Sequence, residues 1–177
     1  MNYFELYGLP VLMKVDMNDV KKKFYALSRK YHPDFFANAS DEEQADVLEK
    51  SSIINKAYKT FQNPDETIRY VLLLHDLIEE EEKYNLDNSF LMEVMEINEQ
   101  LMDAEMEENI ETLNSIQKQA NDLLIKIYSD VAKIVEHYQE GVTAEKELLR
   151  VKDYYYRKKY LHRILDKIAQ MRNIASP

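Results

Sequence analysis

Glycine and proline are scarce in this chain, and their scarcity limits the possible folds more than any other feature. Only 2 of the 177 residues are glycine and 4 are proline, which is too few for the many tight turns of a β sandwich or barrel. Glutamate, lysine, leucine, isoleucine, methionine and alanine dominate instead, and these residues favour helices. We therefore expect an all-α protein, with a core formed from the 45% of residues that are hydrophobic.

Capping residues mark the starts of four predicted helices in residues 1–76. Side chains of Asn, Asp and Ser accept hydrogen bonds from the free backbone N–H groups at a helix start. A glutamate three residues later completes a capping box after Asn2 and after Ser40. Gly8 is expected to end the first helix, and Pro33 ends the second because the residue before proline is pushed out of the α region. The four start residues are Asn2, Asp16, Ser40 and Asn63.

The second and third predicted helices each carry an apolar stripe. In the second helix Val20, Phe24, Leu27 and Tyr31 recur at intervals of three or four residues, which places them on one narrow face. Because the third helix repeats this pattern, the two helices are expected to pair as an antiparallel hairpin. The third helix contributes Val47, Ser51, Ile54, Tyr58 and Phe61.

A change of composition separates this region from the second half of the chain. Glu79 to Glu82 is a run of four like charges, and such a run usually faces solvent. We therefore predict domains at residues 1–76 and 89–177, joined by an acidic linker at 77–88. The second domain is expected to be a three-helix bundle in which the last two helices form an elongated hairpin. The predicted helices span about residues 89–107, 110–137 with Gly141 as the stop, and 143–174.

Charge and residue types exclude several classes of function. The net charge of −10 argues against general binding of nucleic acid or of an anionic membrane. Cysteine is absent and the four histidines are scattered, so we expect no metal site and no cofactor. No apolar run is long enough to span a bilayer, and no secretory signal is visible. The sequence therefore predicts a soluble cytoplasmic protein.

A basic face is predicted on the second helix of this acidic chain. It lies opposite the apolar stripe, where side chains reach solvent. Basic side chains at the rim of an interface steer association with an acidic partner. The alternative is that these helix charges are solvated and have no partner. The face contains Lys22, Tyr25, Arg29 and Lys30, with Lys21 and Lys23 behind them.

The tetrapeptide Tyr31-His32-Pro33-Asp34 lies at the corner between the two helices of the predicted hairpin. His32 and Asp34 are the residue types of a general-base pair, but such a pair also needs a nucleophile and an oxyanion stabiliser. The sequence contains no nucleophile elbow, glycine-rich phosphate loop or zinc-binding His-Glu-x-x-His motif. Pro33 is expected to stiffen the turn and to aim the two side chains apart. We therefore predict no catalytic residue and no enzyme activity. The alternative to any functional role for the tetrapeptide is an ordinary turn between two helices.

The surroundings of this corner resemble the J domain of the DnaJ family over about residues 1–76. The resemblance implies that His32, Pro33 and Asp34 contact a DnaK-type chaperone and stimulate its ATP hydrolysis. It also implies that the basic face docks on that chaperone. Besides the corner, the matching segments are Tyr3-Phe4-x-Leu6, Ile54-Asn55-Lys56-Ala57-Tyr58, Asn63-Pro64 and Arg69-Tyr70.

The helix predicted from residue 89 carries a second apolar stripe about 120° around the helix from its core stripe, which consists of Phe90, Val94, Ile97 and Leu101. Two neighbouring helices of a bundle can bury a wide apolar arc, so burial is one expectation. A partner site is the other, because methionines adapt to a shaped partner and an apolar patch with a polar rim is typical of a binding surface. The stripe contains Leu91, Met95 and Met102, with Met92 and Met106 nearby and Glu96, Glu99 and Asp103 at its border.

The layout of the whole chain is similar to the HscB family, the J-type co-chaperones of iron–sulfur cluster assembly. It has no Gly/Phe-rich linker and no Cys-x-x-Cys repeat, and the strings Asn2 to Pro10 and Phe90-Leu91-Met92-Glu93 match the family. The lack of a cysteine-rich N-terminal extension favours a bacterial form. The resemblance implies that the bundle binds the cluster scaffold IscU through Leu91, Met92, Met95, Glu96, Glu99, Asp103 and Tyr160.

The function expected from the sequence is therefore that of a monomeric co-chaperone with two protein partners. It would stimulate a DnaK/HscA-type ATPase and deliver an IscU-type scaffold to it. A J protein that delivers a different client and a purely structural helical adaptor are the alternatives. The run Tyr154-Tyr155-Tyr156 has no role in this prediction.

Overall fold

The computed structural model describes residues 1–175, and within them every regular element is a helix, which confirms the all-α prediction. Helices in the described part are all too short or too polar to cross a membrane. The chain forms two compact units, which we describe separately. Among the described residues, the first unit contains 1–77 and 135–144, and the second contains 78–134 and 145–175.

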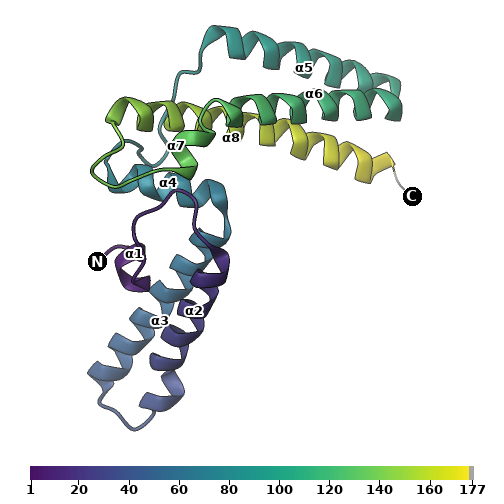
Figure 1. Ribbon diagram of the computed structural model, residues 1–177. Coiled ribbons are helices and arrows are strands. Elements are labelled where there is room, and N and C mark those ends of the chain that lie inside the picture. Colours follow the sequence, from purple (N-terminus) through teal and green to yellow (C-terminus); the bar gives the residue numbers. More distant parts are fainter. Residues whose placement is uncertain (176–177) are drawn as a thin grey trace. The chain divides into compact units, whose positions relative to one another are not determined.

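The first unit is built on a helical hairpin (Figure 1). The predicted caps are confirmed: Asn2 and Ser40 form capping boxes, Asp16 and Asn63 cap their helices, and Gly8 ends the first helix in a left-handed conformation with φ 59°. The elements are α1 (Tyr3–Tyr7), α2 (Met17–Lys30), the 3₁₀ helix η1 (Pro33–Phe36), α3 (Asp41–Gln62) and α4 (Pro64–Leu74).

The core of this unit lies where α1 and α4 pack against α3. Phe4 and Phe61 are both buried, with ring centroids 5.0 Å apart. The hydroxyl of Tyr7, also buried, donates a hydrogen bond to the Ile54 carbonyl at 2.8 Å. Towards the corner the hairpin consists of two helices alone, so the predicted stripe residue Tyr31 is only half-buried. The corner is therefore exposed at the end of the hairpin.

Residues 135–144 pack with the first unit, although the sequence-based division placed them in the second domain. The His75 ring nitrogen Nε2 lies 2.8 Å from the Tyr138 hydroxyl and 3.3 Å from a Glu140 carboxylate oxygen. Lys14 and Glu136 form an exposed ion pair at 3.3 Å. Burial, together with the hydrogen bond to Glu140, raises the pKa of Tyr138, so its hydroxyl stays protonated and can donate.

The second unit contains the predicted three-helix bundle, formed by α5 (Asn88–Glu107), α6 (Ile110–Ser129) and α8 (Glu145–Ala175), which lie side by side (Figure 1). The predicted core stripe of α5 is confirmed, because its members are buried against the other two helices. It consists of Phe90, Val94, Ile97 and Leu101.

The prediction of one helix over residues 110–137 is wrong, because α6 ends at Ser129 and a short α7 spans Ala132–Glu136. The Ser129 hydroxyl donates to the Lys126 carbonyl at 2.7 Å. The Arg150 guanidinium donates to the Asp130 carbonyl at 2.8 Å, in place of a helical N–H group. Gly141, predicted as the stop directly after that helix, lies instead in the loop before α8, with φ 73°.

The acidic segment before α5 is docked on α8, so the prediction that its whole glutamate run faces solvent is wrong for Glu82. The Glu82 carboxylate accepts hydrogen bonds from Lys152 at 2.6 Å and from the Tyr156 hydroxyl at 3.1 Å. Burial acts to raise the pKa of Glu82, but these hydrogen bonds and the Lys152 charge outweigh it and lower the pKa. The Tyr84 ring stacks on Tyr156 at 4.5 Å. This contact assigns Tyr156 a structural role that the sequence left open.

Candidate functional site

The first candidate site is the corner in the first unit. Pro33 starts η1, and His32 is its N-cap: the Asp34 backbone N–H donates to the His32 ring nitrogen Nδ1 at 3.3 Å. The Asp34 carboxylate lies 3.6 Å from the same nitrogen. The prediction that Pro33 aims the two side chains apart is therefore wrong. The tight turn of a 3₁₀ helix brings the N-cap side chain back over the residue two positions later.

This geometry suits contact with another protein better than acid–base chemistry. The side chains of His32 and Asp34 are 52% and 86% exposed, so water has free access to both groups. When Nδ1 of the neutral ring accepts the backbone hydrogen bond, Nε2 carries the proton and is a donor. The corner therefore presents a ring N–H and a carboxylate, a donor and an acceptor held in fixed positions by one turn.

Phe35 is a corner residue that the sequence analysis missed. It is 72% exposed, and its ring lies edge-on to the His32 ring with centroids 5.9 Å apart. A large aromatic side chain held on the surface is typical of an interface anchor. The signal in the sequence was a phenylalanine directly after the His-Pro-Asp motif, in a segment with no helical periodicity that would bury it.

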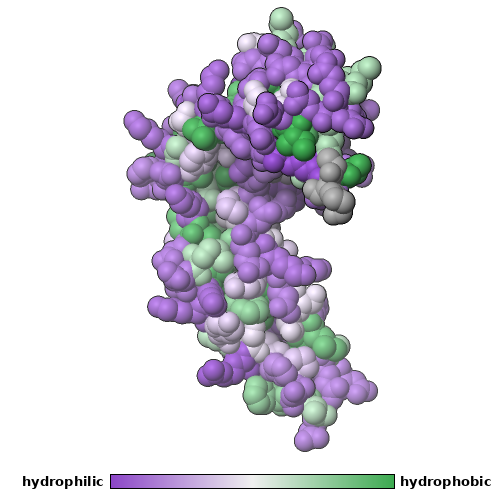
Figure 2. Space-filling model, turned by 90° about the vertical axis from the view of Figure 1, so that its right-hand side faces the viewer, coloured by the Kyte–Doolittle hydropathy of each residue, from purple (hydrophilic) through white to green (hydrophobic). Residues whose placement is uncertain are grey.

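The predicted basic face is exposed on α2. Lys22, Arg29 and Lys30 all reach solvent, and Tyr25 beside them is 58% exposed. Lys23 differs, because its ammonium donates to the Gly8 carbonyl at 3.2 Å and so contributes to the fold. In the view of Figure 2 hydrophobic side chains form only small, separate areas on a largely hydrophilic surface. The α2 face therefore offers a partner three exposed cations and one exposed tyrosine ring.

The second candidate site is a methionine face on α5, which we define as Leu91, Met92, Met95, Met102 and Met106. The four methionines are 57–84% exposed, so the bundle does not bury them and the burial alternative is excluded for these four residues, whereas Leu91 is half-buried. Glu96, Glu99 and Asp103 at its border are also exposed. Met92, Met95, Glu96 and Glu99 line a shallow groove, whereas Asp103 lies further along the helix.

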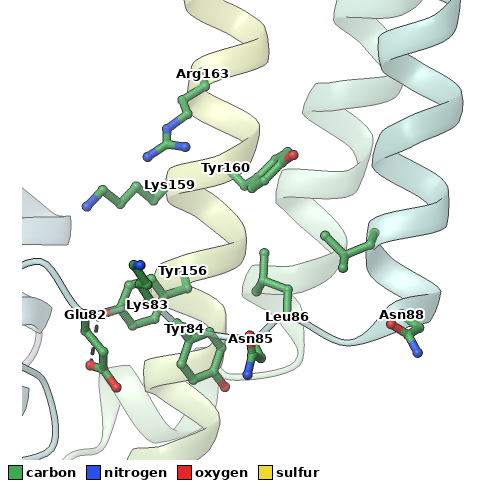
Figure 3. Close-up of a pocket in the computed structure, with 11 residues that line it drawn as sticks. Glu82, Lys83, Tyr84, Asn85, Leu86, Asn88, Tyr156, Lys159, Tyr160 and Arg163 are labelled. Carbon is green, nitrogen blue, oxygen red and sulfur yellow. Dashed lines mark hydrogen bonds between the residues drawn. The ribbon is translucent and has the colours of Figure 1, made fainter.

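Leu91 and Tyr160 come together in a separate pocket of about 570 Å³ between residues 82–91 and α8 (Figure 3). Both residues are half-buried. In Figure 3 Tyr160 projects from one side of α8, whereas Lys159 and Arg163 project from the other. The predicted scaffold-binding residues thus form two neighbouring surfaces, and Leu91 belongs to both.

Two family models match separate parts of the chain. A protein-family model described as the DnaJ domain matches residues 2–70 of the sequence. A second family model, described as the HSCB C-terminal oligomerisation domain, matches residues 86–169. Together with the hairpin and its exposed corner, the first match makes the chain a J-domain protein. The second match covers the three-helix bundle.

Individual relatives point to one group of J-domain proteins. The co-chaperone protein HscB homolog of Colwellia psychrerythraea is 38% identical over 104 residues, which span 58% of this chain and 59% of that relative. Chaperone HscB from Vibrio cholerae has a similar structure, with a TM-score of 0.74, 27% identity and 98% of both chains covered. Human co-chaperone protein HscB gives a TM-score of 0.79 at 28% identity, covering 97% of this chain and 82% of that one. The chain belongs to the HscB family of J-domain co-chaperones.

Proposed function

We propose that this protein is a co-chaperone that stimulates ATP hydrolysis by a DnaK/HscA-type chaperone and delivers an IscU-type iron–sulfur scaffold to it. The observation that carries the proposal is the presence of two unlike exposed surfaces in separate compact units. One is the corner with its basic face, and the other is the methionine face with its acidic rim.

The first unit would act on the chaperone. Basic side chains on α2 attract an acidic chaperone surface and raise the association rate. The corner then supplies a ring N–H from His32, a carboxylate from Asp34 and the exposed Phe35 ring for specific contacts. The proposal assigns ATP hydrolysis to the chaperone, with no catalytic group and no cofactor contributed by this chain.

The second unit would hold the client protein. Flexible methionine side chains fit an apolar client surface, and the acidic rim favours a client with basic residues around that surface. Because both partners bind one chain, each binding event raises the effective concentration of the other partner, so modest affinities suffice. This arrangement suits transient delivery in the cytoplasm, where we place the protein.

Two assays test the two halves of the proposal. The first measures steady-state ATP hydrolysis by a DnaK/HscA-type chaperone with and without the full chain. His32→Gln should abolish stimulation without changing the thermal unfolding of the protein, because the His32 side chain is largely exposed. If the His32→Gln variant still stimulates ATP hydrolysis, the part of the proposal that concerns the chaperone is refuted.

The second assay measures binding of an IscU-type scaffold to the full chain by calorimetry. A saturable 1:1 interaction is expected, and it should weaken in the double variant Leu91→Ala with Met95→Ala. If the wild-type chain stimulates the ATPase but does not bind the scaffold, it delivers a different client, and the second half of the proposal is wrong.

A further inference from the structure

Three cations border the pocket in which Leu91 and Tyr160 meet. Lys83 comes from the segment before α5, and Lys159 and Arg163 lie four residues apart on the same side of α8 (Figure 3). All three side chains are exposed, and within residues 1–175 none of them forms an ion pair. Like charges at this helical spacing repel each other weakly, and an anion bound between them would relieve that repulsion.

Other cations on the same helix have partners. Lys152 pairs with Glu82 at 2.6 Å, and Arg157 pairs with Asp153 at 2.6 Å. The chain carries 33 acidic residues against 23 basic ones, so acids are in excess. The pocket therefore gathers three cations on a chain that is acidic overall.

One wall of the pocket is held rigidly before any partner binds. The Tyr84 ring stacks on Tyr156 with an angle of 8° between the planes, and the Tyr84 hydroxyl donates to Asp153 at 2.9 Å. Glu82, the acidic residue that lines the pocket, is neutralised by Lys152 and hydrogen-bonded by Tyr156. It therefore offers little repulsion to an incoming anion, and a preformed site loses less entropy on binding.

We propose that this basic pocket binds an acidic segment of the client protein whose apolar surface docks on the methionine face. The inference rests on the client-binding half of the proposed function. Lys83, Lys159 and Arg163 would pair with carboxylates, and the tyrosine rings would contact an apolar side chain between them. Leu91 joins the pocket to the methionine face. Basic residues of the client would meet the acidic rim of α5, and its acidic segment would meet this pocket.

The shape of the pocket favours a peptide segment over a small inorganic anion. The pocket of about 570 Å³ is half open to solvent and has room for more than one side chain. Tyrosine rings and the Leu86 side chain form much of its lining, and apolar walls of this kind contribute nothing to binding of a bare phosphate. An acidic segment with one apolar side chain uses both the cations and the apolar walls.

Zero-length cross-linking tests the pocket in the unaltered protein. The full chain and an IscU-type scaffold are mixed, treated with a carbodiimide that joins amines to carboxylates, and analysed by mass spectrometry. The expected products join Lys83 and Lys159 to Asp or Glu residues of the scaffold. A complex that forms normally but yields no cross-link from either lysine would overturn the proposal. Cross-links from these lysines to a second copy of this chain would also overturn it.

A matched pair of triple variants tests the energetic role of the pocket. Replacing the three pocket cations by glutamine should slow association with the scaffold about tenfold at low ionic strength and weaken its salt dependence. Three exposed lysines of the same unit outside the pocket provide a control with an equal loss of charge, which should change the rate by less than about twofold. The pocket variant is Lys83→Gln, Lys159→Gln, Arg163→Gln, and the control is Lys118→Gln, Lys133→Gln, Lys146→Gln.

The outcomes separate this inference from the proposed function. Equal association rates for the pocket and control variants, with wild-type binding intact, would refute the pocket and leave client delivery standing. No binding of the scaffold by the wild-type chain would refute both. Thermal unfolding of each variant should match the wild type, because the substituted side chains are exposed.

Discussion

Replacing Met95 by alanine should weaken client binding without destabilising the protein. Met95 is 60% exposed, so docking of a client can remove at most that fraction of the side chain from water. Full burial of a methionine side chain is worth about 1.5–3 kcal/mol, and 60% of this gives roughly 1–2 kcal/mol. Since about 1.4 kcal/mol corresponds to a tenfold change in affinity, the expected loss is about 5- to 20-fold.

Calorimetric titration of an IscU-type scaffold into the full chain would measure this loss, and denaturant unfolding would measure stability. Ile125→Ala provides the control, because Ile125 is 69% exposed on α6 in the same unit and lies outside the methionine face. The control should bind like the wild type. If Met95→Ala binds within about twofold of that control, the methionine face does not contact the client and the reasoning from exposure is refuted.

Three further predictions concern the corner, the core and the docked acidic segment. Phe35→Ala should lower the maximal stimulation of the chaperone ATPase while unfolding stays unchanged, since Phe35 is 72% exposed; unchanged stimulation would exclude Phe35 as a contact. Tyr7→Phe removes the buried hydrogen bond to the Ile54 carbonyl and should lower the free energy of unfolding by about 1 kcal/mol, measured in urea; no shift of the midpoint would contradict this. Burial, with the hydrogen bond to Asp153, raises the pKa of Tyr84 to about 12. The stabilisation by Tyr84 should therefore be complete below pH 10 and be lost as the pH rises through 12, so the difference in unfolding free energy between the wild type and Tyr84→Phe should shrink over that window.

Local signals were sufficient for most of the helix starts. An Asn, Asp or Ser side chain caps the helix that begins next to it, and the interaction spans only two or three residues. The starts at Asn2, Asp16, Ser40 and Asn63 are therefore predictable without any tertiary contact, and the structure confirms them. The position of the His-Pro-Asp corner followed from the same signals.

Contacts between residues far apart in the chain were not predictable from these patterns. The end of α6 involves Arg150, twenty residues later, which binds the Asp130 carbonyl. Glu82 looked like part of a solvated run, but Lys152 and Tyr156 of α8 hold it against the bundle. A pattern read along the chain carries no information about such partners, because burial of a charge depends on what the fold brings next to it.

The sequence by itself determined the all-α class, the helix starts and the two candidate surfaces, because composition, caps and helical periodicity act locally. Only the tertiary structure decided whether the second apolar stripe of α5 is buried or exposed. A helix can bury an arc only where neighbouring helices cover it, and α6 and α8 cover Phe90 and Leu101 but leave Met92 and Met95 in solvent. The structure also decided that Lys83, Lys159 and Arg163 border one pocket.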